Sequence, residues 1–136
     1  GSVQMCIRDR LVTLASIIQK EAGNVAEMPL ISAVFHNRLK LGIPLQADPT
    51  VIYGVKDFDG NLTRRHLQEE TPYNTYRRRG LPPGPIASPG SAALYAAAFP
   101  ADVKYLYFVS KGDGSHVFSA TLKEHNRAVQ RYQLRR

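Results

Sequence analysis

The stretch Leu11–Gly23, LVTLASIIQKEAG, is the part of the chain around which the rest is predicted to fold. Its apolar residues recur every three or four positions, which predicts an amphipathic helix. With about 100° between successive residues, Glu21 falls between Leu14 and Ile17, inside the apolar arc. Gly23 is expected to end the helix as a left-handed C-cap. The stretch therefore predicts a helix with one carboxylate on its buried face.

The expected surroundings of Glu21 indicate acid–base chemistry. An apolar environment disfavours the charged form of a carboxyl group and raises its pKa. A carboxyl group that titrates near neutral pH can serve as a general acid. The alternative is a structural glutamate at the edge of a helix, paired with an arginine such as Arg38. The helical pattern alone leaves both interpretations open.

Length and composition are typical of one soluble globular domain. The chain has 136 residues, of which 43% are hydrophobic and 21% charged. No apolar run is long enough to span a membrane, and no stretch has the order of a signal peptide. Gly1-Ser2 is typical of a scar left by tag cleavage. We therefore expect residues 1–10 to be a tag remnant and a disordered lead-in, and residues 11–136 to be a domain cut from a longer protein.

The cysteine count and the net charge limit the kinds of site and partner that the chain can have. Cys6 is the only cysteine, which excludes an internal disulfide and a thiolate zinc site. The histidines show no metal-ligand spacing, so neither a metal nor another cofactor is expected. The net charge of +7 suits an acidic polymer, either nucleic acid or an anionic glycan, but also a solvated basic surface. No nucleic-acid-binding motif accompanies the charge, so nucleic acid is not expected as a partner.

A second helix is predicted to pair with the first. Residues 24–27 have the spacing of a capping box, a proline follows in the first turn, and a glycine follows the last apolar residue at position 41. The short connection predicts an antiparallel helix pair. This pairing is expected to bring Asn37 or Arg38 near Glu21, where they either orient the carboxylate or brace the two helices.

The segment 43–89 is weakly periodic and rich in Pro, Gly, Asn and Asp. We expect a short strand at Val51–Tyr53, a short helix at Thr63–Glu70 and otherwise an ordered working surface. Sugars are bound by aromatic faces and by amide and hydroxyl groups. Candidate substrate-binding residues in this groove are Gln46, Asp48, Thr50, Tyr73, Asn74 and Tyr76.

The last third of the chain predicts a helix, a hairpin and a closing helix. Ser88 and Pro89 are expected to start a helix that ends before Pro100. The strand composition of Tyr105–Ser110 and the return at His116–Ser119 predict a hairpin, with His116 bordering the groove. A capping box at positions 121–124 starts the C-terminal helix, with Leu122, Val129 and Tyr132 expected inward. The predicted class is α+β, with a helix pair, an irregular groove and a small antiparallel sheet.

Several motifs, taken together, resemble one known family. They are LASIIQKEAG (14–23), VFHNRL (34–39), LQADPTVIYG (45–54), TPYNTY (71–76), GLPPGPIASPG (80–90), YLYFVS (105–110), HVFS (116–119) and EHN (124–126). In this order they resemble the catalytic domain of the YceG-like endolytic murein transglycosylases, the MltG family. The resemblance covers roughly residues 11–133.

The resemblance implies cleavage of the β-1,4 bond between N-acetylmuramic acid and N-acetylglucosamine within a peptidoglycan strand. The implied product is a 1,6-anhydro-muramyl end. The family's catalytic glutamate corresponds to Glu21, and Gln46 with the Tyr73-Asn74 pair would lie in the sugar groove. Some members carry a second acidic residue where this chain has Gln19, whose amide cannot act as a general acid.

The resemblance also implies an inner-membrane anchor and a LysM-like module upstream. It thus implies action on nascent glycan strands at the outer face of the cytoplasmic membrane, near the cell-wall glycan polymerases. Peptidoglycan is the expected partner, and a membrane is expected only through the missing anchor.

The chemistry of such a reaction needs one residue, first as acid and then as base toward the muramyl 6-OH. A hydrolase would need a second carboxylate, about 5–5.5 Å away for retention or about 6.5–9.5 Å away for inversion. Asp48 is the candidate, although the following Pro49 is more typical of a turn or an N-cap. Polar groups of Gln46, Tyr73 or Asn74 would meet positive charge that develops on the sugar. A water-using muramidase and a non-catalytic peptidoglycan-binding module therefore remain as alternatives.

Overall fold

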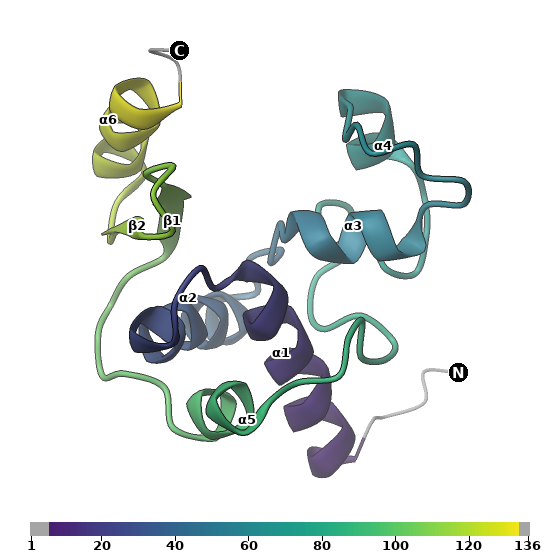
Figure 1. The fold of residues 1–136 in the computed structure, drawn as a ribbon, viewed down its shortest axis with the longest axis horizontal. Helices are drawn as coiled ribbons and strands as arrows, with labels where there is room; N and C mark the ends of the chain where they lie inside the picture. The colour runs from purple at the N-terminus through teal and green to yellow at the C-terminus, as the bar shows by residue number, and fades with distance from the viewer. Residues whose placement is uncertain (1–5, 134–136) are drawn as a thin grey trace.

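The computed structural model describes residues 6–133 and shows an α+β fold, as predicted (Figure 1). Its only sheet over these residues is an antiparallel hairpin of β1 and β2, in which Phe108 pairs with Phe118. The elements are α1 (Ile7–Glu21), the 3₁₀ turn η1 (Val25–Glu27), α2 (Met28–Leu41), α3 (Asp48–Gly54), α4 (Arg64–Gln68), α5 (Ser91–Ala98), β1 (Tyr107–Ser110), β2 (His116–Ser119) and α6 (Leu122–Tyr132). None of the helices in this range is long and apolar enough to cross a membrane.

The core lies between α1, α2 and α5. The apolar face of α1 supplies Leu14, Ile17 and Ile18, all buried. The neighbouring α2 adds Ile31 and Phe35. Three buried alanines at positions 93, 96 and 97 lie on α5, whose packing against α1 is the most extensive between any two elements. Because alanine has no side chain beyond Cβ, the backbones of α1 and α5 approach closely, and α1 is held rigidly on this side.

Both ends of α1 differ from the prediction. The expected lead-in is wrong for residues 7–10, which form the first turn of the helix, with the backbone N–H of Asp9 donating to the sulfur of Cys6 at 3.4 Å. Residues 1–5 lie outside the described part of the chain. At the other end, Ala22 is the C-cap in an extended conformation, so Gly23 is not a left-handed cap.

Gly23 has a different role, because the turn of the hairpin packs against it. A Cβ atom at this position would lie 2.2 Å from the carbonyl oxygen of Gly114. The next residue, Asn24, donates from its side chain to the same oxygen at 3.0 Å. Its own oxygen accepts from the backbone N–H of Glu27 at 3.0 Å, which confirms the predicted cap. The connection between α1 and α2 is therefore also the surface on which the turn of the hairpin packs, and we call this contact the seat of the hairpin.

Both predicted helices are present and pack against each other, and α2 ends at Leu41 with Gly42 in the left-handed region at φ 69°. The expected strand at Val51–Tyr53 is wrong, since these residues belong to α3. Pro49 fits the first turn of that helix, and Val51 is buried toward the core, so tertiary packing overrides the β-propensity of the segment. The short helix predicted at Thr63–Glu70 is present as α4, capped by Thr63.

Three smaller predictions are corrected in the last third of the chain. The cap of α5 is Gly90, not Ser88, and its N–H donates to the side chain of Gln19 at 2.9 Å. The strand β1 begins at Tyr107 instead of Tyr105, and the carbonyls of Val103 and Tyr105 before it accept from the side chain of Asn37, both at 2.9 Å. In α6 Leu122 is 56% exposed, contrary to expectation, whereas Val129 is half-buried and lines the cavity and Ala128 is buried.

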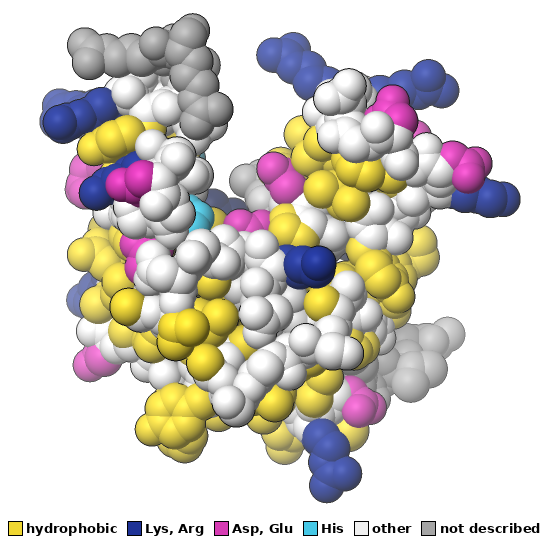
Figure 2. All heavy atoms as spheres, viewed as in Figure 1, with side chains coloured by type: hydrophobic (Ala, Val, Ile, Leu, Met, Phe, Trp, Pro, Cys, Tyr) yellow, Lys and Arg dark blue, Asp and Glu magenta, His cyan; other side chains and the backbone are white. Residues whose placement is uncertain are grey.

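The elements outside the core form two walls (Figure 1). One wall is the hairpin with α6, and the other is α3 with α4 and the following loop. The space-filling view shows a deep hollow between them, with acidic side chains and a histidine visible toward its floor (Figure 2). The segment after α1 lies at the foot of the first wall, so changes there are expected to move the hairpin.

Replacing Gly23 with alanine tests this attachment. The added methyl group would overlap the backbone of Gly114, and relieving the overlap is expected to lower the free energy of unfolding by about 1–3 kcal/mol. Chemical denaturation measures the loss. The matched control is Gly84→Ala, where the new Cβ would lie 3.5 Å from the hydroxyl of Tyr73, an ordinary contact. Equal stability of the two variants would contradict the proposed seat of the hairpin.

Candidate active site

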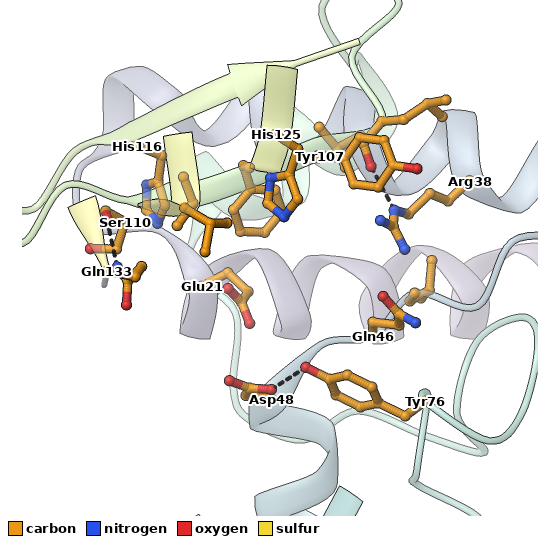
Figure 3. A pocket seen from close by; sticks show the side chains of 16 residues that line it. Glu21, Arg38, Gln46, Asp48, Tyr76, Tyr107, Ser110, His116, His125 and Gln133 are labelled. Carbon is orange, nitrogen blue, oxygen red and sulfur yellow. Dashed lines mark hydrogen bonds between the residues drawn. The ribbon is translucent and has the colours of Figure 1, made fainter. Parts of the chain in front are cut away.

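A cavity of about 360 Å³ lies between the two walls (Figure 3). Its lining comes from the end of α1, from α2, from the start of α3, from the loop that carries Tyr76, and from the hairpin with α6. The polar residues in this lining are Glu21, Arg38, Gln46, Asp48, Tyr76, Tyr107, Ser110, His116, His125 and Gln133. Of the predicted substrate-binding residues, the structure therefore brings Gln46, Asp48, Tyr76 and His116 together with Glu21.

Glu21 is half-buried at the last position of α1, and its carboxyl group faces Asp48 across the cavity (Figure 3). Burial raises the pKa of Glu21 from about 4.5 to about 7, and the negative charge of Asp48 adds to the shift. Within the described residues, no group donates a hydrogen bond to this carboxyl group, and no cation pairs with it. With a pKa of about 7, Glu21 is present in both its protonated and its charged form at neutral pH.

Asp48 is more exposed than Glu21 and is fixed by one strong contact. The hydroxyl of Tyr76 donates to its Oδ1 atom at 2.5 Å. Burial, followed by this hydrogen bond, raises the pKa of Tyr76 above its usual value, so the phenol remains a donor. Asp48 lies in the first turn of α3, one residue after the N-cap Ala47. Its charge is thus directed toward the cavity rather than toward the helix end.

Backbone and hydroxyl groups of Thr75 hold the start of α3 in place. The N–H of Gln46 donates to the carbonyl of Thr75 at 3.2 Å, and the N–H of Ala47 donates to its hydroxyl at 2.9 Å. The hydroxyl of Thr50 lies 2.8 Å from that of Thr75. Gln46 has a positive φ of 54°, which is uncommon for a residue other than glycine. This constraint turns its side chain into the cavity (Figure 3).

Contrary to expectation, Thr50, Tyr73 and Asn74 do not line the cavity. Asn74 is 1% exposed, and its amide donates to the carbonyls of Leu67 and Glu69 at 3.0 and 2.6 Å. Thr50 is fully buried, and the ring of Tyr73 packs against that of Tyr53 with centroids 4.8 Å apart. The polar groups of Thr50 and Asn74 form hydrogen bonds within the protein and stabilise the loop that follows α4. In the sequence alone, these residue types cannot be distinguished from a sugar-binding cluster.

His116 attaches the hairpin to the start of α2. The side chain of Glu27 contacts its Nδ1 atom at 3.0 Å and accepts from its backbone N–H, also at 3.0 Å. The ring of His116 lies edge-on to that of Phe108. A single carboxylate thus fixes the histidine that borders the cavity, as the sequence predicted for its position.

Asn37 and Arg38 do not contact Glu21. Asn37 braces the segment before β1, and Arg38 donates to the carbonyls of Leu106 and Pro44, both at 2.7 Å. Of the two expected roles, the contacts are those of bracing. The structural alternative for Glu21, a pair with Arg38, is not observed.

Sequence reasoning missed most of the hairpin wall. Tyr107 stacks on His125 with centroids 4.9 Å apart, and Gln133 donates to the carbonyl of Ser110 at 2.8 Å. Burial lowers the pKa of His125, and the charge of Arg38 contributes. The predicted strand and helix contained these residues, but only their packing on the end of α1 shows that they face Glu21. Over residues 6–133, no cluster of His, Cys, Asp and Glu could hold a metal ion.

The fold and cavity define a small α+β domain with one poorly hydrated carboxylic acid in a cleft. A family model described as the YceG-like family matches residues 3–131, so the chain belongs to this family. The match begins before the resemblance recognised in the sequence, which covered roughly residues 11–133.

Relatives from Bacillus and Streptococcus are both described as endolytic murein transglycosylases. The chain is 46% identical over 123 residues to the endolytic murein transglycosylase of Bacillus subtilis and 32% identical over 127 residues to that of Streptococcus pneumoniae. The matches cover 90% and 89% of this chain but 34% and 23% of the relatives. The crystal structure of a YceG-like protein from Listeria monocytogenes superposes with a TM-score of 0.83 at 42% identity, covering 88% of this chain and 39% of that one.

The pKa of Glu21 leads to a prediction for folding stability. Because this pKa is raised in the folded state, the folded protein binds the proton more tightly than the unfolded chain, and stability falls as the pH rises from about 4.5 to about 7. The loss from this group is about 3 kcal/mol. Glu21→Gln is expected to remove it and to be more stable than the parent at about pH 8, but not at about pH 4. Denaturation at both pH values measures the difference, and a constant difference would contradict a raised pKa.

Proposed function

We propose that this chain is the catalytic domain of an endolytic peptidoglycan lytic transglycosylase. The observation that carries the proposal is the carboxyl group of Glu21, which lies in a cleft, is poorly hydrated and has a pKa of about 7. Relatives at 46% and 32% identity are endolytic murein transglycosylases, which supports the substrate class. The chain spans about a third of the Bacillus subtilis relative, with 34% covered, and the proposal extends to the activity of the whole protein.

In the proposed first step, protonated Glu21 donates its proton to the glycosidic oxygen between N-acetylmuramic acid and N-acetylglucosamine. The bond from that oxygen to C1 of the muramyl residue breaks, and N-acetylglucosamine leaves with a free 4-hydroxyl. Positive charge develops on the muramyl ring at the same time. Asp48 is the charged carboxylate that faces this region, and the amide of Gln46 also points into the cavity, so both can stabilise that charge.

In the second step, Glu21 acts as a base. Its carboxylate accepts the proton of the muramyl 6-hydroxyl while O6 bonds to C1, which gives the 1,6-anhydro end and restores the acid. The nucleophile belongs to the substrate, so the step requires neither a bound water nor a covalent bond to the enzyme. A pKa near neutral serves both steps because neither donation nor acceptance is then strongly uphill.

One alternative reaction has a structural basis. Asp48 faces Glu21 across the cavity, and a paired carboxylate is what a water-using muramidase needs. Lytic transglycosylase action is favoured because Asp48 is already bound by Tyr76, while its charge maintains the proton on Glu21. A non-catalytic binding module would not require a carboxyl group with such a pKa.

We place the action of the whole protein outside the cytoplasmic membrane, where murein lies, with an anchor and a LysM-like module upstream of this domain. Nascent glycan strands are the proposed substrate, and cell-wall glycan polymerases are the proposed neighbours.

Glu21→Gln is expected to abolish cleavage of purified sacculi, with a loss of about 100-fold or more, because an amide can neither donate nor accept the proton. Mass spectrometry of the released muropeptides provides the readout, and the parent protein should release anhydro-muramyl ends. Glu70→Gln removes an exposed carboxylate that pairs with Arg77, outside the cavity, and should leave activity unchanged. Reducing ends from the parent would instead identify a muramidase, and full activity of Glu21→Gln would rule out the acid–base role.

Asp48→Asn tests the electrostatic role of the second carboxylate. Because the charge of Asp48 raises the pKa of Glu21, its removal lowers that pKa, and the protonated acid is lost at a lower pH. The alkaline limb of the pH–rate profile is therefore expected to move to lower pH, with a modest loss of activity at its optimum. Asp102→Asn, at an exposed position outside the cavity lining, is the charge-matched control. Complete loss of activity at every pH would favour the muramidase reaction.

A further inference from the structure

Arg38 is a buried cation without an anionic partner. The residue is 6% exposed, and no carboxylate among the described residues forms an ion pair with it. Burial lowers the pKa of the guanidinium group because it disfavours the charged form. A buried charge that lacks a counterion costs folding free energy. If Arg38 only braces the fold, its buried charge lowers the stability of the protein without a compensating ion pair.

Its hydrogen bonds leave most of the guanidinium group unused. A guanidinium group carries five N–H donors. Nε donates to the carbonyl of Leu106 and Nη1 donates to that of Pro44, both at 2.7 Å. The other three have no acceptor among the described residues. The group lies 5.0 Å from the centroid of the Tyr107 ring and faces the cavity between that ring and Gln46 (Figure 3).

The cavity therefore has two ends of different charge. Glu21 and Asp48 form the acidic end, and the pKa of Glu21 is set by burial and by Asp48 rather than by Arg38. At the other end, the guanidinium group of Arg38 lies over the ring of Tyr107 and near the phenol of Tyr76. Arg38 is thus not the counterion of the acid, and a ligand that fills the cavity can reach both ends.

We propose that Arg38 is a carboxylate-binding subsite of the cavity, which receives an acidic group of the murein strand whose glycosidic bond lies at Glu21. The two carbonyl contacts fix the plane of the guanidinium group, so its free N–H groups are pre-oriented for a carboxylate. The ligand is identified by this chemistry alone. Murein offers such a group in two places, namely the lactyl carboxylate of a muramyl residue without a peptide and the carboxylates of a stem peptide.

This inference rests on the proposed function for the identity of the ligand, so its test measures binding in Glu21→Gln, which cannot cut. Three soluble probes of equal sugar number are compared by calorimetry. They are tetra-N-acetylchitotetraose, which is neutral, a murein tetrasaccharide with free lactyl carboxylates, and the same tetrasaccharide with stem peptides. We expect at least one acidic probe to bind about tenfold more tightly than the neutral probe, because a charge-assisted hydrogen bond replaces solvation by water. Which acidic probe does so identifies the source.

Variants at position 38 test whether the preference for an acidic probe depends on Arg38. In the Glu21→Gln background, Arg38→Gln is expected to abolish the tenfold preference while binding of the neutral probe persists. Arg38→Lys should retain only part of the preference, because lysine lacks the planar fork. Arg79→Gln removes the same charge from an exposed position outside the cavity and should preserve the preference.

Equal affinity for all three probes overturns the subsite, and this comparison does not require the variants at position 38 to fold. A preference that survives Arg38→Gln also overturns it. Failure of the proposed function looks different, because the subsite would then bind its acidic probe while the parent protein released no anhydro ends from sacculi.

Discussion

The packing of α1 against α5 is the constraint on which the site depends. Three small side chains of α5 allow the two helices to approach closely, and the apolar residues of α1 are buried on that side and against α2. The last residue of α1 therefore has a fixed position at the floor of the cavity. This position places the carboxyl group of Glu21 where burial raises its pKa, so the raised pKa follows from the fold.

The hairpin wall is positioned through the same helix end. Gly23 and Asn24 receive the turn at Gly114, while Glu27 holds the backbone and ring of His116. The opposite wall depends on Thr75, which holds the start of α3 by its carbonyl and hydroxyl. Both walls are thus attached to the core by hydrogen bonds in addition to apolar contacts, such as that of Phe108 with Phe35 and the burial of Ala47.

Much of the fold follows from local pattern. The period of α1, the cap at Asn24 and the strand composition of β1 are short-range signals, and each predicted its element. The β-branched residues of Val51–Tyr53 predict a strand, because such residues favour strands. The segment is a helix instead, since Pro49 lies in its first turn and Val51 is buried. The local sequence predicts that Gly23 is a helix cap. The structure shows another reason for the glycine, namely the backbone of Gly114, which lies 91 residues further along the chain and which the local pattern does not reveal.

The site was predictable where it depends on one helix face and not where it depends on tertiary contact. The spacing of the apolar residues in Leu11–Gly23 predicts Glu21 on the buried face of a helix, and the structure places it in the cavity lining. The roles of Asn74 and Tyr107 could not, because amides and phenols serve equally well as internal braces and as contacts for a ligand. Only the structure shows that the amide of Asn74 is consumed by carbonyls while the ring of Tyr107 lines the cavity.

The alanine face of α5 has a consequence for sequence variation. This helix contributes no residue to the cavity, yet any larger side chain at its three buried alanines would push α1 from behind. Displacement of α1 would move Glu21 without altering any residue that lines the cavity. Substitutions on this rear face are therefore expected to alter the geometry of the cavity, and a small molecule bound between α1 and α5 would act on Glu21 from a distance.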